Sequence, residues 1–393
     1  MRTALSSVAS MATRAPTGFV PPPYPHDRLD HLRVVAAAVP GGMVDASIGT
    51  PVDPMPDVVL RALAEAAPRA TGYPPTVGSP EYRAAAASWV GRRFGVTVGI
   101  ESVMACIGTK EVVASLPRML WLRDPSRDTV LYPGVSYPTY AMGAELAGLR
   151  AVPIPVDAAW HPDLSAVDPD DAARSLLVWL NDPANPTGVT ATPEVMQASV
   201  AWARDHGAIV ASDECYAEFT YDASGAPASP VTALQAGTDG VLAVHSLSKR
   251  SNMAGLRAGF VVGDRALVGY LGEVRKHAGL MTPAPIQAAA AAALGDDTHV
   301  ATQRARYEQR RDLMLGGLAA YGLVHDGGPA PFYLWLHSED QVDDGWELAA
   351  RLAEAGTLVA PGSLYGPAGA DHVRLALTQP TDRLELVLER LGA

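Results

Sequence analysis

The chain has 393 residues, of which 48% are hydrophobic and 18% are charged, and its formal net charge is −12 at pH 7. This composition is typical of a folded protein with enough apolar residues for about two domains. The negative charge and the absence of a basic cluster exclude nucleic acid and anionic membrane surfaces as favoured partners. No apolar run reaches the ~18 residues that a membrane helix needs.

The N-terminal stretch is rich in Ser, Ala, Thr and Pro and holds no sustained apolar run, so it does not indicate a secretory signal. We expect residues 1–28 to form a disordered tail. The two cysteines, Cys106 and Cys215, lie in apolar, strand-like segments and are expected to be buried free thiols. Free thiols are typical of a reducing compartment, which favours the cytoplasm.

Short apolar runs alternate with helix-like stretches between residues 100 and 265. The runs are Val103–Ile107, Thr129–Tyr132, Ala151–Ile154, Leu176–Leu180, Ala208–Ala211, Val241–Val244 and Gly259–Val262. A helix is predicted over Pro193–His206, with proline at its start and Gly207 just past its end. The alternation predicts an α/β fold in which helices cover both faces of a mostly parallel, seven-stranded sheet.

The pattern changes after about residue 290. A long helical stretch there precedes two strand-like runs, Phe332–Leu336 and Val373–Leu377. We expect a large domain over residues 45–290 and a smaller α+β domain over residues 29–44 and 291–393. Ligands of such sheets bind beyond the carboxyl ends of the strands. The site is therefore expected in the cleft between the two domains.

Lys249 is the most informative single residue. It follows the run Val241–Val244 within Ser246-Leu-Ser-Lys249, and Arg257 comes eight residues later. A lysine amine at the end of a buried strand can form a Schiff base with a phosphorylated aldehyde cofactor. Ser246, Ser248 and Arg257 can then hold the phosphate. For this short motif taken alone, an ordinary solvated lysine is the alternative.

Two further motifs follow predicted strands. Gly108-Thr109-Lys110 opens a helix, whose free backbone amides suit a phosphate, although an ordinary strand-to-helix turn is the alternative. Asn185 lies in the loop Asn181–Gly188, which two prolines and a glycine hold in an irregular shape. This loop follows the buried run Leu176–Leu180 and would present Asn185 as a directed donor. An ordinary loop without a functional role is the alternative.

Asp213 ends another strand-like run and is expected to be buried, so it needs a cation or several donors. A protonated pyridine nitrogen is one such cation, and Tyr216 could reach the phenolic oxygen of the same ring. A role as a helix N-cap is the alternative for Asp213. Tyr137 offers an aromatic face to an aromatic cofactor, with packing in the core as its alternative.

Arg374 lies within a strand-like apolar run, where an arginine without an anionic partner is costly. A substrate carboxylate held by two parallel hydrogen bonds is one such partner, and a structural Asp or Glu is the alternative. Tyr73 lies far upstream in a turn-rich loop and shows no functional signal by itself.

Taken together, these motifs resemble the fold-type I pyridoxal-phosphate aminotransferases of class I and II, from about Val44 to Leu391. The resemblance implies that Lys249 binds the cofactor covalently and then moves the proton between Cα and the cofactor. It also implies that Asp213 pairs with the pyridine nitrogen. The remaining ring contacts that it implies are hydrogen bonds from Asn185 and Tyr216 to the ring oxygen and stacking of Tyr137.

The same resemblance implies the contacts of the phosphate and the substrate. The phosphate would be held by the backbone amides of Thr109 and Lys110 and by Ser246, Ser248 and Arg257. Arg374 would grip the substrate α-carboxylate, assisted by Asn185 and the backbone near Gly49. Tyr73 would reach the phosphate of the neighbouring subunit, which implies a homodimer with shared active sites.

Several stretches, among them Ile48–Pro54 and Ile107–Glu111, are similar to the actinobacterial N-succinyldiaminopimelate aminotransferases. That group transfers an amino group from glutamate to N-succinyl-2-amino-6-oxopimelate, on the route to diaminopimelate and lysine. Lys110 differs from the small residue that many relatives carry in the phosphate cradle. The contact for the distal carboxylate stays open between Lys276, His277 and loops of the neighbouring subunit.

Other activities stay open because one scaffold supports several chemistries. The enzyme alternatives are an aspartate, aromatic or glutamate–prephenate aminotransferase and a pyridoxal-phosphate-dependent C–S lyase. A non-catalytic sensor that binds the cofactor and regulates transcription is a third class. It is disfavoured because a short, weakly basic tail stands where such proteins carry a DNA-binding domain.

Overall fold

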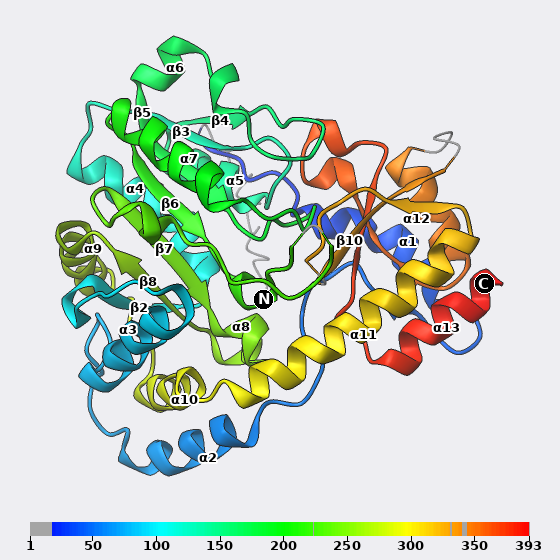
Figure 1. The fold of residues 1–393 in the computed structure, drawn as a ribbon, viewed down its shortest axis with the longest axis horizontal. Coiled ribbons are helices and arrows are strands. Elements are labelled where there is room, and N and C mark those ends of the chain that lie inside the picture. The colour runs from blue at the N-terminus through cyan, green and yellow to red at the C-terminus, as the bar shows by residue number, and fades with distance from the viewer. Residues whose placement is uncertain (1–17, 223, 331, 340–343, 393) are drawn as a thin grey trace, which may run out of the picture.

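The computed structural model describes residues 18–222, 224–330, 332–339 and 344–392. A large sheet with its helices occupies one side of the molecule and a smaller α+β part the other (Figure 1). Of the expected tail, residues 1–17 lie outside the described set. Residues 18–24 form no helix or strand, whereas Pro25–Leu29 forms a 3-10 helix, η1, which anchors the end of the expected tail through the fully buried Leu29.

The large sheet contains the seven predicted strands. In spatial order they are β2 (Val103–Ile107), β8 (Ala258–Gly263), β7 (Val241–Ser246), β6 (Ile209–Asp213), β5 (Ser175–Asn181), β3 (Thr129–Pro133) and β4 (Arg150–Ile154). Strands β4, β3, β5, β6 and β7 pair in parallel, and β8 runs antiparallel to both of its neighbours. The predicted α/β class and the mostly parallel sheet are confirmed.

Helices cover both faces of this sheet. One face packs against α3 (Pro80–Phe94), α7 (Pro193–Asp205) and α10 (Ala284–Leu294), and the other against α4 (Thr109–Arg123), α5 (Thr139–Leu146) and α9 (Arg265–His277). The shorter helices are α2 (Asp57–Ala66), α6 (Pro169–Ala173) and α8 (Leu247–Arg250). Within β5, Val178 and Leu180 enter one core while Leu177 and Trp179 enter the other, as the alternation along a strand requires.

The boundaries of α7 show how local sequence fixes a helix. The side chain of Thr192 accepts a hydrogen bond from the backbone N–H of Val195, and Pro193 occupies the first turn. The helix ends at Asp205, and Gly207 follows with a positive φ of 66°. The predicted helix is therefore confirmed to within one residue.

The smaller part joins both ends of the described chain. Its four antiparallel strands run in the order β12 (Ala360–Pro361), β13 (Val373–Ala376), β10 (Tyr333–Ser338) and β9 (Leu323–His325). Its helices are α1 (Asp30–Ala37), α11 (Thr298–Ala320), α12 (Gly345–Glu354) and α13 (Thr381–Leu391). From the N-terminal side, β1 (Val44–Asp45) pairs in parallel with β11 (Thr357–Leu358).

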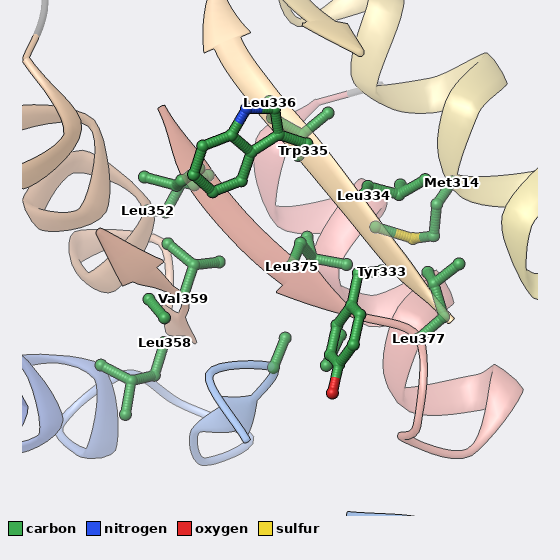
Figure 2. Close-up of a cluster of buried hydrophobic side chains, with 14 of the residues drawn as sticks. Met314, Tyr333, Leu334, Trp335, Leu336, Leu352, Leu358, Val359, Leu375 and Leu377 are labelled. Carbon is green, nitrogen blue, oxygen red and sulfur yellow. The ribbon is translucent and has the colours of Figure 1, made fainter. Parts of the chain in front are cut away.

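Figure 2 shows the apolar core of this smaller part. Leu334 of β10 points toward Met314 of α11, while Tyr333 and Trp335 project from the other face of the strand. Trp335 is fully buried, and Tyr333 reaches the junction with the large sheet, where it contacts Tyr216. The domain boundaries themselves stay a prediction. Among the described residues, no helix is both long and apolar enough to cross a membrane.

Candidate active site

A cavity of about 250 Å³ lies where the carboxyl ends of β5, β6 and β7 meet the smaller sheet. Every residue that the sequence pointed to, except Tyr73, Lys276 and His277, lines this cavity. They are Gly49, Thr109, Lys110, Tyr137, Asn185, Asp213, Tyr216, Ser246, Ser248, Lys249, Arg257 and Arg374. The strands thus bring together side chains that are far apart in the sequence, at the edge of the sheet where ligands bind.

Lys249 lies in the short helix α8, directly after β7. Its Nζ donates a hydrogen bond to the carbonyl oxygen of Gly49. Burial lowers the pKa of Lys249 to about 8, and the positive charges of Arg374 and Arg257 act in the same direction. About a tenth of the amine is therefore uncharged at pH 7, far more than for an ordinary lysine, and the uncharged amine is the state that a nucleophile needs.

Asp213 ends β6 and is only 7% exposed. Its Oδ2 accepts a hydrogen bond from the Tyr140 hydroxyl at 2.9 Å, and its Oδ1 accepts one from the backbone N–H of Cys215 at 3.2 Å. Burial raises the pKa of Asp213, while these two hydrogen bonds oppose the shift. The alternative role as a helix N-cap is not adopted, because the next element, η5 (Ala217–Phe219), has Tyr216 as its N-cap.

The turn from β2 into α4 forms one wall of the cavity. Gly108 has a φ of 70°, and a Cβ at this position would collide with the guanidinium of Arg257. The close approach leaves the first backbone amides of α4 facing the same space as Arg257, Ser246 and Ser248. Helix amides, hydroxyls and a guanidinium together form a donor set suited to a phosphate group.

Arg374 reaches the cavity from β13. Its Nη1 donates to Oδ1 of Asn185 at 2.8 Å and its Nη2 to the carbonyl oxygen of Ser47 at 2.6 Å. The guanidinium also stacks on the rings of Tyr333 and Tyr365, with its carbon 4.2 and 4.9 Å from the two centroids. These partners are all uncharged. Its Nε is buried and has no hydrogen-bond partner among the described residues, so a donor remains for an anion.

Several lining residues were missed by the sequence analysis, and three of them hydrogen-bond to predicted site residues. Tyr140, one helical turn after Tyr137, holds Asp213, and its spacing in Tyr137-Pro-Thr-Tyr140 was the available signal. Asn181 accepts from the backbone N–H of Asn185 at 2.7 Å and so fixes the loop that presents this residue. Tyr333, whose hydroxyl lies 2.8 Å from that of Tyr216, gave no signal because its apolar run resembles core.

The lining of the cavity includes residues from the segment assigned to the tail. The Nζ of Lys110 donates to the hydroxyl of Tyr24 at 3.1 Å and lies 6.0 Å from the centroid of Tyr137. His26 also lines the cavity. Burial lowers the pKa of His26 to about 4, helped by the charge of Arg374, so this imidazole is neutral at pH 7. The composition of this segment, rich in Ser, Ala, Thr and Pro, did not indicate a functional role for either residue.

The three remaining candidates lie elsewhere in the chain. Tyr73 is 95% exposed and does not reach the cavity of its own chain. Lys276 is exposed and pairs with the carboxylate of Glu273 at 2.8 Å. Neither Lys276 nor His277 lines the cavity. Within one chain, Lys276 and His277 therefore do not supply the contact for the distal carboxylate of the substrate.

Comparison with known proteins identifies the family. The family described as aminotransferase class I and II matches residues 42–391. The 4-dedimethylamino-4-oxo-anhydrotetracycline transaminase OxyQ of Streptomyces rimosus is 44% identical, over 94% of this chain and 99% of its own. A probable aminotransferase of Mycobacterium tuberculosis is 43% identical, over 98% of this chain and 89% of its own.

The likeness extends to a solved structure. A probable N-succinyldiaminopimelate aminotransferase from Thermus thermophilus is 30% identical and aligns with a TM-score of 0.83, covering 94% of this chain and 99% of that one. The family match spans most of the chain, and the fold agrees with it. The chain therefore belongs to the class I and II aminotransferases.

Proposed function

We propose that this aminotransferase uses pyridoxal phosphate and transfers an amino group between N-succinyl-L,L-diaminopimelate and 2-oxoglutarate. The observation that carries the proposal is the convergence of Lys249, Asp213 and Arg374 on one cavity. A pyridine aldehyde cofactor and an amino-acid substrate require three kinds of group. The cavity holds all three: an amine of lowered pKa, a buried carboxylate and a guanidinium with a free donor.

The residues fit the cofactor at both of its ends. Asp213 is the partner for the protonated ring nitrogen, since only two hydrogen bonds from the described residues reach its carboxylate. Tyr137 is the stacking partner of the ring, and Asn185 and Tyr216 are the donors for its oxygen. The phosphate would be held by the α4 amides of Thr109 and Lys110 with Ser246, Ser248 and Arg257.

When bound, pyridoxal phosphate supplies an electron sink that stabilises negative charge at the substrate Cα. The Nζ of Lys249 then acts as the base that removes the proton from Cα. Arg374 orients the α-carboxylate through its free Nε and the adjacent Nη2, which form a fork suited to a carboxylate. Its contacts with Asn185 and Ser47 hold that fork in place.

The distal carboxylate of the substrate needs a second cation, and we assign Lys110 to this role. Lys110 and Arg374 line the same cavity. Partial burial disfavours the charge of Lys110, but contacts with Tyr137 and Tyr24 outweigh this effect and raise its pKa. The ammonium therefore stays charged at neutral pH. A similar structure named as a probable N-succinyldiaminopimelate aminotransferase supports this choice of substrate.

We further propose that the protein acts as a homodimer with shared active sites. Tyr73 is almost fully exposed and faces no part of its own cavity. In a dimer it would reach the phosphate site of the partner subunit. Several apolar side chains are also exposed, among them Val34, Ile48 and Leu60.

A second candidate substrate comes from the relative OxyQ, whose name gives a polycyclic ketone as its substrate. At 44% identity over nearly the whole chain, this relative favours an anhydrotetracycline-type ketone as the amino acceptor. Such a substrate needs no distal cation, so Lys110 distinguishes the two candidates.

The first experiment records the visible spectrum of the purified, cofactor-loaded protein while N-succinyl-L,L-diaminopimelate is added without a keto acid. We expect the cofactor band to convert to the pyridoxamine form and to return when 2-oxoglutarate is added. A band that ignores this compound but responds to glutamate, aspartate or aromatic amino acids would refute the substrate and keep the reaction.

A pair of lysine variants makes the test specific. Lys110→Met should raise the half-saturating concentration of the succinylated substrate at least tenfold, since one charged contact is worth about 1.5–3 kcal/mol. The matched control is Lys276→Met, because Lys276 is exposed and lies outside the cavity. Equal effects of the two substitutions would show that Lys110 does not bind the distal carboxylate.

A further inference from the structure

Three side chains with metal-ligating atoms meet on the smaller sheet, outside the catalytic cavity. Asp326 follows β9, His337 belongs to β10, and His372 directly precedes β13. One ligand atom from each residue lies within 4.8 Å of those of the other two. His372 is buried, His337 is half-buried and Asp326 is exposed, so the group opens to solvent on one side.

Hydrogen bonds orient both imidazoles in the way that metal-binding histidines require. The Nδ1 of His337 lies 2.8 Å from the carbonyl oxygen of Ser338, which can only accept. The proton of His337 is therefore on Nδ1, and its Nε2 carries a free lone pair. The Nδ1 of His372 lies 2.7 Å from the carboxylate of Asp371, and its Nε2 lies 3.0 Å from Asp326. A carboxylate or carbonyl behind the distal nitrogen is the usual support of a metal-binding histidine.

Aromatic neighbours hold His372 in position. The ring of Trp335 stacks on it at 4.9 Å between centroids, with planes 11° apart. Trp160 meets it edge-on at 5.0 Å, and His337 at 5.2 Å. Because the buried imidazole is packed on these sides, its Nε2 keeps one direction, toward the exposed Asp326.

We propose that Asp326, His337 and His372 bind one divalent transition-metal ion of the zinc class. Two imidazole nitrogens and one carboxylate oxygen are a donor set that zinc accepts, with water from the open side as the fourth ligand. Ligands of one tetrahedral zinc ion lie about 3.3 Å apart. The Nε2 of His372 and the carboxylate of Asp326 are already 3.0 Å apart, so binding requires the half-buried side chain of His337 to approach these two groups by a small movement.

The proposed metal site lies on the same face of the small sheet as Arg374, which lines the catalytic cavity. Side chains two residues apart on a strand share a face and lie about 7 Å apart, so His372 and Arg374 project from the same face of the small sheet. Trp335, which stacks on His372, is paired with Arg374 across β10 and β13. A bound ion would tie the turn after β9 to the strand that carries Arg374 and so stabilise the smaller part of the molecule.

The test is a calorimetric titration of the purified, cofactor-loaded protein with Zn²⁺. We expect one Zn²⁺ ion bound per chain. Co²⁺ added to the metal-free protein should bind with the same stoichiometry and quench tryptophan fluorescence, because Trp335 and Trp160 both contact His372, and Zn²⁺ should then displace it. His337→Gln and Asp326→Asn should each weaken Zn²⁺ binding at least tenfold. Asp371→Asn, which removes the carboxylate behind His372, should weaken it by about 10–100-fold.

His277→Gln is the matched control, since His277 is an exposed histidine outside the group. It should leave the Zn²⁺ affinity unchanged, and circular dichroism checks that each variant is folded. Zinc binding that survives both His337→Gln and Asp326→Asn would overturn the proposal. The absence of saturable Zn²⁺ binding to the unaltered protein would overturn it as well.

Discussion

At the scale of single residues, two basic side chains that line the cavity, Arg374 and Lys249, differ in protonation. The guanidinium of Arg374 keeps its charge under all ordinary conditions. The amine of Lys249 has its pKa lowered to about 8, since burial and the charges of Arg374 and Arg257 disfavour the ammonium form. One cation can therefore bind an anion while the other exchanges a proton near neutral pH.

The lowered pKa of Lys249 predicts how cofactor binding depends on pH. Below about pH 8 most of the amine is protonated, and the protonated amine does not attack an aldehyde. The rate at which pyridoxal phosphate reconstitutes the apoprotein should therefore rise with pH up to about pH 8 and then level. Stopped-flow absorbance of the cofactor band measures this rate. A rate that kept rising toward pH 10.5, the ordinary value for lysine, would contradict the lowered pKa. Lys249→Ala should show neither the band nor turnover.

Arg374→Lys is predicted to separate substrate binding from cofactor binding. A single ammonium replaces a fork that holds Asn185, Ser47 and a carboxylate, so the KM for the amino acid should rise about 10–100-fold. The visible band of the cofactor should persist. Steady-state kinetics and the spectrum measure the two effects. Arg383→Lys is the control, because Arg383 binds backbone carbonyls far from the cavity. An unchanged KM for Arg374→Lys would exclude the assigned role.

At the scale of elements, the proposed phosphate cradle depends on the turn between β2 and α4. Gly108→Ala is predicted to weaken pyridoxal phosphate binding at least tenfold, because a Cβ would collide with Arg257 and the backbone conformation costs about 1–3 kcal/mol for other residues. Equilibrium dialysis measures the dissociation constant. Gly91→Ala in α3 is the control, since the nearest atom to its Cβ would be the Val96 carbonyl oxygen at 3.8 Å. Equal cofactor affinity in both variants would contradict the role of the turn.

The elements also show why apolar runs in the sequence predict the positions of strands but not the direction in which each strand runs. Strands such as β5 and β7 are buried along most of their length, so their apolar runs mark them to within one or two residues. The reversed direction of β8 was not predicted, because apolar runs carry no information on direction. The short segment 247–257 between β7 and β8 leaves no room for the crossover that a parallel pair needs.

At the scale of the whole molecule, the proposed shared-site dimer predicts complementation between inactive variants. Tyr73→Ala should impair the partner's site, while Lys249→Ala should inactivate its own. A hybrid dimer of the two carries one intact site, so refolding an equal mixture should restore about a quarter of the activity per site. Activity assays of the mixture and of each variant alone measure this. Additive activities, with no gain on mixing, would show that Tyr73 does not act across subunits.

The sequence by itself determined the seven strands of the large sheet, the class of fold and the cavity-lining residues that follow those strands, such as Asn185, Asp213 and Lys249. These features depend on short-range patterns of burial and on side-chain chemistry at strand ends, which a linear sequence displays. Arg374 was also recognisable, because a charge within an apolar strand requires a partner.

Only the tertiary structure decided which distant segments meet. It brought Tyr24 and His26 from the N-terminal segment and Tyr333 from the small sheet into the cavity, and it set His372 beside His337. None of these placements follows from local periodicity, because each depends on how separately formed cores pack against one another. Local burial thus fixed the elements, and the packing of those elements fixed the composition of the site.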